Sequence, residues 1–528
     1  MFEATLWAFL PALVAIVLAL VTKKVYPSLF AGIFVGALLY SGGNIMNTFS
    51  EIIMLIGAKL GENGGILVFL VVLGVFAIIL SATGATRAYG EWAAERILSK
   101  RGSLLATIAL GCLIFVDDYF NCLTVGSVMR PVTDKHNVSR AKLAYIIDST
   151  AAPVCIIAPI SSWAAAVSGF LDGESAIITF IMTIPFNLYA ILTLTTMICV
   201  SLLGIDFGKM RKNEECAAAG DLFAGEYELP SEDIDTDARS GGKVWYLIVP
   251  IVILILCCVG SMIYNGFFYN WDTGLMDSEL QSSNVIEAFS NCDAGISLGV
   301  GSLIALIITF IVYIISKALS FKECMESLTK GFKSMVPAIL ILILAWTLSG
   351  IMGAKGGYLD AKGFVETNMT NLAESGLATV LFPAIFFLAA CAISFATGTS
   401  WGTFGILIPV ATSILGTSLD PSVILAISAI LAGAVYGDHV SPISDTTIMA
   451  SSGAQCNHVD HVKTQLPYAS LCAAISFVAY IIAGLIVNTG IGYAGAALTT
   501  LGVGFALLLL TFGAICIYRR KTADKSGK

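Results

Sequence analysis

The stretch Gly437-Asp-His-Val-Ser-Pro-Ile-Ser-Asp-Thr-Thr447 contains two carboxylates, a histidine, a proline and four hydroxyl side chains. The apolar runs on both sides of it are long enough to lie in a bilayer. A charged side chain at the membrane centre costs at least about 2.5 kcal/mol, so such residues usually line an ion or substrate path. Asp438 and Asp445 are therefore our first candidates for functional residues.

The composition places this polar stretch in a membrane protein. Of 528 residues, 57% are hydrophobic and 12% are charged, whereas charged residues make up about a quarter of a soluble domain. Several apolar runs approach or reach the roughly 20 residues that cross a bilayer as a helix: Leu10 to Val21, Ile66 to Leu80, Ile181 to Leu203, Val244 to Gly260, Leu298 to Ile315 and Leu501 to Ile517. We predict an all-α polytopic membrane protein with about eleven transmembrane helices plus two re-entrant hairpins.

The remaining composition narrows the class of protein. No basic residue precedes the first apolar run, so we expect a retained first helix that starts outside rather than a cleaved signal peptide. The thirteen cysteines are scattered without a CxxC pair, which favours buried apolar residues over disulfides or metal ligands. Basic patches interleaved with aromatics are missing, so we set nucleic-acid binding aside.

Weak internal echoes predict an inverted repeat, a common plan for secondary transporters. Gly84-Ala-Thr-Arg-Ala-Tyr89 is echoed by Gly353-Ala-Lys-Gly-Gly-Tyr358, and Thr124-Val-Gly126 by Thr403-Phe-Gly405. The predicted organisation is a first half over 1–205, a linker over 206–242, a second half over 243–518 and a tail over 519–528. The linker holds an acidic run without apolar periodicity, so we expect it to be partly flexible and cytoplasmic.

Lys and Arg concentrate in short cytoplasmic loops, which orients the helices. We place the following segments inside: Lys23-Lys24, Arg87 to Arg101, Arg130 to Lys142, Lys209 to Lys212, Lys317 to Lys333 and Arg519 to Lys521. Phe267 to Asp293 contains no Lys or Arg and should lie outside. Matched elements of the two halves then face opposite sides. The N-terminus is predicted outside and the C-terminus in the cytoplasm of a cell with this chain in its inner (plasma) membrane.

Two segments leave one side of the membrane, break at polar residues and return to the same side. We predict re-entrant hairpins at about 103–133 and about 375–416. Helices broken at Asp148 to Pro153 and at Asp438 to Pro442 follow the hairpins. Unwound backbone at membrane depth is tolerated only where it is buried in protein or lines a wet cavity. We therefore expect two hairpin tips and two broken helices to meet near the midplane.

Polar side chains at these four breaks are the candidate ion- and substrate-binding residues. Carboxylates, hydroxyls and freed carbonyls are the oxygen ligands that a sodium ion or a proton needs, and half-helix N-termini suit anionic groups. The candidates are Asp117, Asp118 and Asn121; Asp148, Ser149 and Thr150; Thr397, Thr399 and Ser400; and Asp438, His439, Ser441, Ser444, Asp445, Thr446 and Thr447. Trp163 and Trp401 are candidate walls of the cavity.

Each candidate also has a purely structural interpretation. One aspartate of each pair could cap a half-helix, since Asp is a favoured N-cap residue. His439 could relay protons or be a hydrogen-bonded structural residue. The two tryptophans could pack the hairpins. His458-Val-Asp-His461 falls in a predicted cytoplasmic loop and fits no standard zinc spacing, so we expect no metal other than sodium there. We expect no cofactor beyond sodium and protons as transported or coupling ions.

The polar segments resemble a known family. Gly437 to Thr447, continued by His458-Val-Asp-His-Val-Lys-Thr-Gln-Leu-Pro-Tyr468, strongly resembles the signature of sodium/proton antiporters of the NhaC type, within the ion transporter superfamily. Phe115 to Tyr119, Arg130 to Asp134 and Lys142 to Pro153 also look like that family. The resemblance implies an inner-membrane secondary transporter with inverted repeats, re-entrant hairpins and an elevator-like motion, often in a homodimer.

The residues leave the cargo open. Our first hypothesis is a sodium/proton antiporter. The alternative is a sodium- or proton-coupled carrier or exchanger of a small organic acid, such as malate or lactate, or of an amino acid. The polar breaks contain no Arg or Lys to bind a carboxylate substrate, which favours a cation. A channel lacks support because no filter-like repeat occurs. An enzyme lacks support because no nucleophile elbow, phosphate loop or zinc helix motif occurs.

Overall fold

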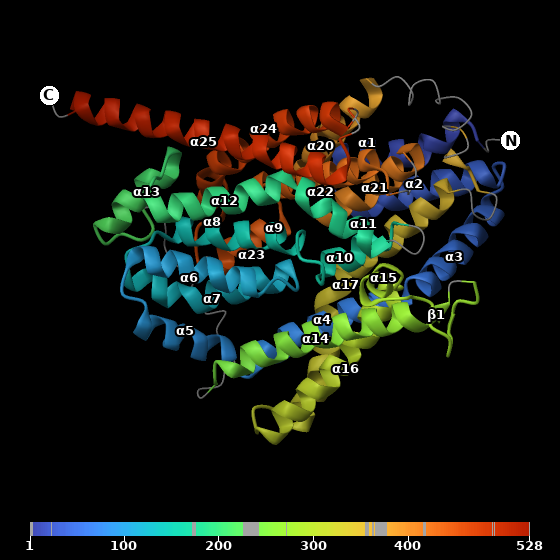
Figure 1. Cartoon of the computed structure of the whole chain (residues 1–528), viewed down its shortest axis with the longest axis horizontal. Coiled ribbons are helices and arrows are strands. Elements are labelled where there is room, and N and C mark those ends of the chain that lie inside the picture. Colours follow the sequence, from blue (N-terminus) through green and yellow to red (C-terminus); the bar gives the residue numbers. More distant parts are fainter. Residues whose placement is uncertain are drawn as a thin grey trace.

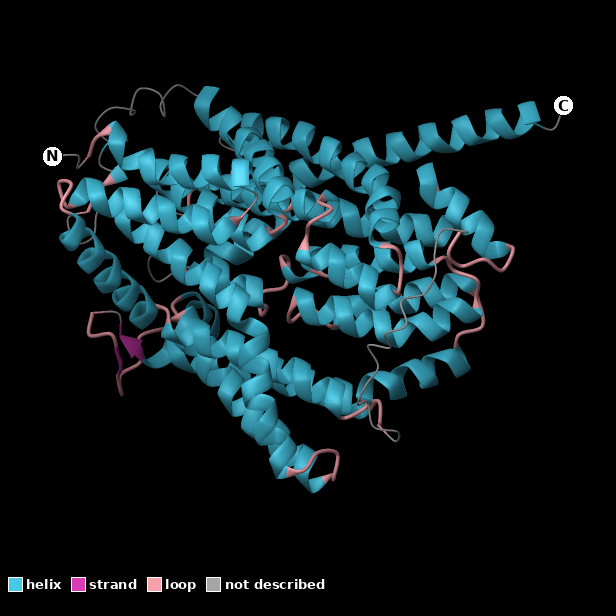
Figure 2. Ribbon diagram, turned by 180° about the vertical axis from the view of Figure 1, so that it is seen from behind, coloured by secondary structure: helices cyan, strands magenta, loops and turns pink. Residues whose placement is uncertain are grey.

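The computed structural model describes residues 4–22, 24–171, 176–224, 242–270, 272–353, 358–361, 364, 377–415, 419–487, 489 and 491–526. These residues form helices joined by short loops, with a single two-stranded ribbon (Figure 1). Strands β1 (Tyr269–Asn270) and β2 (Leu275–Met276) are antiparallel and pair Tyr269 with Met276. Figure 2 shows this ribbon at the edge of the molecule.

The part of the chain before the acidic linker and the start of the linker contain these helices: η1 (Leu6–Phe9), α1 (Leu10–Thr22), α2 (Val25–Tyr40), α3 (Ile45–Glu62), α4 (Gly64–Ala82), α5 (Ala85–Arg96), α6 (Lys100–Leu113), α7 (Asp118–Lys135), α8 (Arg140–Thr150), α9 (Ala152–Cys155), α10 (Ser162–Ser168), α11 (Ala176–Thr183), η2 (Ile184–Phe186), α12 (Leu188–Leu203) and α13 (Gly208–Ala218). Helix α13 lies within the predicted linker, whose residues 225–241 are outside the described part.

The part after the linker contains these helices: α14 (Trp245–Phe268), α15 (Val285–Ser290), α16 (Ala294–Ile315), α17 (Phe321–Met352), α20 (Leu377–Thr397), α21 (Ser400–Leu415), α22 (Pro421–Val440), α23 (Asp445–Ala454), α24 (His458–Val487) and α25 (Tyr493–Ser526). Side-chain caps fix several starts. Ser320 and Glu323 form a reciprocal capping box at α17, and the Asp420 carboxylate accepts a hydrogen bond at the start of α22.

The chain is an all-α polytopic membrane protein. Within the described residues, eight helices are long and apolar enough to cross a membrane, or up to ten if each of two bent pairs counts as one span. About eleven were expected, and some of the apolar runs are divided in the structure. Helices α2 and α3 meet at a bend of 120°, and Leu6–Leu18 and Ser400–Leu415 are shorter than a full span.

The helices pack in two neighbouring groups. Helix α4 packs on α16 and α17, and α14 packs on α16 (Figure 1). Helix α20 packs on α22 and α24, while α12 packs on α24. Helix α22 is the most enclosed of the candidate spans, with 94% of its apolar window buried. A helix that is buried all round belongs at the centre of a bundle, so the polar end of α22 lies deep in the protein.

Both segments predicted as hairpins consist of two helices that pack on each other. Residues 114–117 join α6 to α7, and Gly398 and Thr399 join α20 to α21. Gly398 has φ +68°, and a Cβ there would lie 2.3 Å from the Ile443 carbonyl oxygen. Glycine is thus required for the tip of the second pair to approach the break that follows α22. Residues 375, 376 and 416 of the predicted second hairpin lie outside the described residues.

Candidate functional site

Helices α8 and α22 each carry an aspartate at the third position from their last residue. Helix α8 ends at Thr150 and α22 ends at Val440. The backbone N–H of Ala151 donates to the Asp148 carbonyl at 3.2 Å, and that of Ser441 donates to the Asp438 carbonyl at 3.0 Å. Each aspartate therefore lies in the last helical turn before a break in the helix.

The Asp148 carboxylate is fully buried and receives three side-chain hydrogen bonds at one oxygen. Its Oδ2 accepts from Gln465 Nε2 at 2.7 Å, from His461 Nε2 at 3.2 Å and from Thr447 Oγ1 at 3.2 Å. The donors lie on α23 and α24, so three separate helices meet at this carboxylate. Because a buried carboxylate is costly without donors, these contacts explain how the interior accommodates it.

A second imidazole flanks the same carboxylate. His439 Nε2 lies 3.9 Å from Asp148 Oδ1, and both side chains are almost completely buried. His439 Nδ1 lies 3.0 Å from the Tyr189 hydroxyl of α12. The Gln465 amide also donates to the His439 carbonyl at 2.8 Å, which joins the end of α22 to α24.

Asp438 has a different set of partners, all of them hydroxyl groups. Its Oδ2 accepts from Ser400 Oγ at 2.7 Å and from Thr446 Oγ1 at 3.0 Å. Ser400 is the first residue of α21, and Thr446 lies in the first turn of α23, whose N-cap is Ser444. Thr447 Oγ1 lies 3.3 Å from the Asp438 carbonyl and also contacts Asp148. Thr447 therefore connects the two aspartates.

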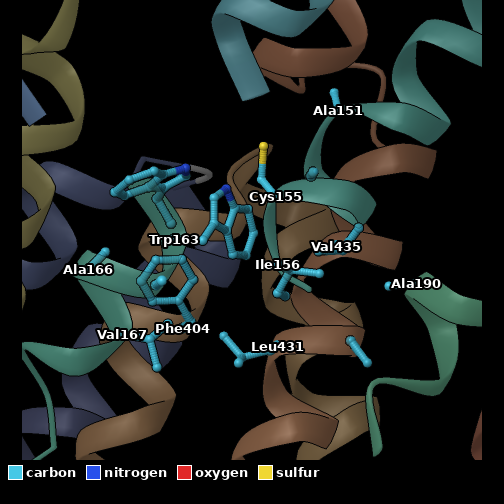
Figure 3. Packing of buried hydrophobic residues seen from close by; sticks show 14 of the residues in the cluster. Ala151, Cys155, Ile156, Trp163, Ala166, Val167, Ala190, Phe404, Leu431 and Val435 are labelled. Carbon is cyan, nitrogen blue, oxygen red and sulfur yellow. The ribbon is translucent and has the colours of Figure 1, made fainter. Parts of the chain in front are cut away.

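Asp118 brings the first helix pair to the same region. It begins α7, is fully buried, and its Oδ2 accepts from Trp163 Nε1 at 3.2 Å. The Trp163 ring lies 5.2 Å from the Phe404 ring (Figure 3). It lies 5.9 Å from the Trp401 ring. The two tryptophans thus join the α10 and α21 sides of the site.

Asp118, Asp148 and Asp438 share one feature. In each, Oδ2 is hydrogen-bonded, while Oδ1 is buried and makes no hydrogen bond to the described part of the chain. No Lys or Arg of the described residues pairs with these three carboxylates. Buried carboxylates with an unpartnered oxygen are unusual, and a bound cation or proton would satisfy them.

Several other sequence candidates use their polar groups to hold the backbone. The Asn121 amide donates to the carbonyls of Gly111, Ile114 and Thr150, which clamps α6 and α7 to the end of α8. Other hydroxyls bond to nearby backbone: Thr150 to Ile146 and Ile147, Thr397 to Ile393, Ser441 to Phe395, and Thr399 to the Gly402 N–H. Ser149 is buried on α8 beside Asp148, and Asp117 is buried beside Asp118.

Asp445 does not join the buried cluster. It is the first residue of α23, where its side chain is exposed, and its N–H lies 3.4 Å from the Gly398 carbonyl. A carboxylate in the first turn of a helix interacts favourably with the helix dipole, as in the capping alternative.

The sequence interpretation missed His461, Gln465 and Tyr189. The assignment of His458 to His461 to a loop is wrong, because α24 begins at His458. The polar start of this long helix resembles a loop in composition. The spacing of His461 and Gln465 was the available signal, since residues four apart share a helix face. Tyr189 lies in an apolar run and gave no such signal.

Comparisons with known proteins show what the chain is similar to. A model of the "Na+/H+ antiporter family" matches residues 172–485. An uncharacterized protein of Haemophilus influenzae is 36% identical over 523 residues, which cover 96% of both chains. The solved structure of the YdaH transporter of Alcanivorax borkumensis is 15% identical, covers 91% of this chain and 99% of that chain, and has a TM-score of 0.46.

Two relatives with named cargoes align over shorter stretches. A malate-2H(+)/Na(+)-lactate antiporter of Bacillus subtilis is 37% identical over 160 residues, 30% of this chain and 31% of its own. An arginine/ornithine antiporter, ArcD, of Halobacterium salinarum is 38% identical over 114 residues, 21% of this chain and 23% of its own.

Proposed function

The chain belongs to the Na+/H+ antiporter family, and on that premise we propose that it exchanges sodium ions for protons across the membrane. It is a secondary transporter in class. Our proposal has three parts: the cargo, the residues that bind it, and a single site that opens alternately to each side of the membrane.

The observation that supports sodium and protons is the set of three buried carboxylates with unpartnered oxygens, Asp118, Asp148 and Asp438. A carboxylate can hold either a proton or a cation, but not both at full strength, and this competition is what an exchanger needs. Asp438, Ser400 and Thr446 bring oxygen atoms from three helices together, as a hard cation prefers. We assign sodium to this oxygen set.

The environment of Asp148 suits the proton more than the cation. Two imidazoles and an amide already surround it, and an imidazole nitrogen can pass a proton to or from a carboxylate. Thr447 links Asp148 to Asp438, so occupancy at one carboxylate would influence the other. A net charge moved per cycle would make exchange sensitive to membrane potential by about 2.3 kcal/mol per 100 mV.

An organic solute is the second candidate. The relatives named for malate, lactate, arginine and ornithine favour it, although each aligns with less than a third of this chain. A carboxylate substrate would also need donors, and half-helix N-termini can supply them without a basic side chain. Sodium and protons would then be coupling ions.

Further parts of the proposal concern the setting of the transporter. We propose that the chain is of the NhaC type and lies in the plasma membrane as a homodimer. Its N-terminus would be outside and its C-terminus in the cytoplasm. The equivalent positions of Asp148 and Asp438 before their breaks support an inverted repeat.

The test is flux into proteoliposomes that contain a pH dye. We expect sodium pulses to move protons, with lithium and potassium as comparison cations. Malate, lactate and amino acids are then added one at a time. Proton movement with sodium alone supports the exchange. No proton movement with sodium, together with rapid flux of an organic solute, would replace the first candidate by the second.

A further inference from the structure

The start of the linker forms a strap, residues 206–223, which crosses the ends of the helices that carry the candidate site. It begins three residues after α12 and contains α13. The sequence predicts a partly flexible segment here. In the structure its polar side chains instead make specific contacts with α8 and α24, the helices that hold Asp148 and two of its donors.

The first contact ties the two helices through one carboxylate. Asp206 is ion-paired with Lys142 of α8, and it accepts from the Tyr468 hydroxyl of α24 at 3.0 Å. Lys142 is only 1% exposed, and its ammonium lies 5.9 and 5.7 Å from the ring centroids of Tyr145 and Tyr468. The Phe207 ring stacks on Tyr468 at 4.0 Å.

A second pair of contacts joins the strap to α8 and α24 nearer the N-terminus of each helix. Glu214 of α13 accepts from the Ser139 N–H and hydroxyl at 2.9 and 2.7 Å, and Ser139 is the N-cap of α8. Asn213 donates to Asp460, in the first turn of α24, at 2.6 Å. The strap therefore contacts each of the two helices at two positions along its length.

These attachments are near the site in the helical register. Lys142 precedes Asp148 by six residues, and Tyr468 follows Gln465 by three. At about 1.5 Å rise per residue, these separations are about 9 Å and about 4.5 Å along the helix axes. A slip of α8 along α24 at the strap would therefore carry Asp148 away from Gln465 and His461.

We propose that Asp206, Lys142 and Tyr468 are positioning residues that fix α8 against α24 and so hold Asp148 on its donors. The inference rests on the proposed function in that Asp148 is taken to be part of the ion site. A buried lysine is expensive unless it is paired, and Asp206 is the carboxylate that pairs it while also reaching the second helix. The linker thus contributes to the affinity of a site it does not touch.

The sharpest variant is Tyr468→Phe, which removes one hydroxyl and leaves the ion pair and the ring stacking in place. Tyr480→Phe is the matched control: it lies on the same helix and is fully buried, and its hydroxyl bonds to the Phe186 and Ser428 carbonyls away from the site. Asp206→Asn tests the ion pair, and Asp206→Glu tests rescue by a carboxylate.

The measurement has two arms on the full-length chain. In proteoliposomes, we expect Tyr468→Phe to raise the apparent KM for sodium at least about fivefold, with a maximal rate close to that of the unaltered chain, because the hydroxyl's bond to Asp206 and the bond it accepts from the Phe207 N–H are both lost. In detergent, hydrogen exchange should become faster in residues 140–150 and 458–468. Tyr480→Phe should change neither, and Asp206→Glu should retain more sodium affinity than Asp206→Asn.

The outcomes are separable. An unchanged KM and unchanged exchange in Tyr468→Phe would overturn the positioning role, as would an equal effect of Tyr480→Phe. If Asp206→Asn does not fold, Tyr468→Phe still decides the question because no charge is unpaired. If the unaltered chain moves no sodium, the proposed function fails, while the hydrogen-exchange arm still tests the strap.

Discussion

Asp148 and Asp438 occupy the same place before a helix break, yet their partners differ in chemistry. Asp148 meets imidazoles and an amide, whereas Asp438 meets only hydroxyls. Imidazoles can exchange protons, while hydroxyl oxygens can turn a lone pair to a cation. Two carboxylates at matched positions can therefore divide the work of an exchanger between them.

Asp438→Asn is expected to abolish sodium-coupled proton movement, because it removes the only carboxylate among the hydroxyls of Ser400 and Thr446 and replaces one of its two oxygens by an amide nitrogen. Asp420→Asn is the matched control at the opposite end of α22. There the side chain only caps the helix, by accepting from the Ser422 N–H, and Asn caps equally well. Flux in proteoliposomes checks both. Wild-type exchange in Asp438→Asn would remove this carboxylate from the site.

Thr447→Val tests the link between the aspartates. The variant keeps the shape of the side chain but loses the hydroxyl that contacts Asp148 Oδ2 and the Asp438 carbonyl. We expect sodium affinity to fall about fivefold, as for one lost hydrogen bond. Thr447→Ser retains the hydroxyl and should stay near the affinity of the unaltered chain. Equal losses in the two variants would assign the effect to packing rather than to the link.

Between elements, close approach of backbones sets the geometry around the site. A Cβ on Gly126 of α7 would lie 2.5 Å from the Gly453 carbonyl carbon of α23, and a Cβ on Gly453 would lie 2.6 Å from the Cys122 carbonyl oxygen. Small residues at such crossings allow membrane helices to pack closely. The first helix pair and the half-helix after the second break are consequently in direct backbone contact.

Gly126→Ala should destabilise the protein, because the added methyl meets backbone that cannot move aside. Overpacking of this kind costs about 1 to 3 kcal/mol. Gly502→Ala on α25 is the control, since nothing lies within 4 Å of the added Cβ. Thermal unfolding in detergent should show a lower midpoint for Gly126→Ala than for Gly502→Ala. Equal midpoints would contradict the close crossing.

The sequence predicted the helices and their breaks better than it predicted the contacts between side chains at the site. Proline and clustered polar residues identified the break after α22, and apolar length identified the spans, because both are local signals. That Thr447, His461 and Gln465 contact Asp148 could not be predicted from local signals. They are about 300 residues away in the chain, and their polarity fits a loop as well as a helix start. Asn121 was a candidate ligand, but its clamp on three carbonyls depends on the tertiary fold.

At the scale of the molecule, the helices around α4, α16 and α17 pack against the site-bearing helices, α17 on α21 and α4 and α16 on α10. Phe170 follows α10 and lies 6.3 Å from Trp346 of α17, ring to ring. Within the first group, the rings of Tyr246 on α14 and Tyr313 on α16 lie 5.8 Å apart. Elevator-like transport would move the first boundary and leave the second unchanged.

Cross-linking distinguishes these two boundaries. In a background without native cysteines, a short bis-methanethiosulfonate reagent that forms a disulfide with each of Phe170→Cys and Trp346→Cys, releasing methanesulfinate, should stop transport reversibly. The same linker between Tyr246→Cys and Tyr313→Cys should leave flux intact, because those helices are expected to stay together. Reducing agent should restore the first variant. Full transport with the first pair linked would argue against relative motion at that boundary.

The contacts around Trp163 and Gly453 cross between the two halves. Helix α10 of the first half faces α21 of the second, and α23 of the second faces α7 of the first. Each half therefore packs against a helix that belongs to the other half. If the chain is cut between residues 224 and 242, we expect neither fragment to fold when expressed alone. The two fragments expressed together should assemble into an active transporter. By the same logic, one half on its own would leave these contact surfaces uncovered.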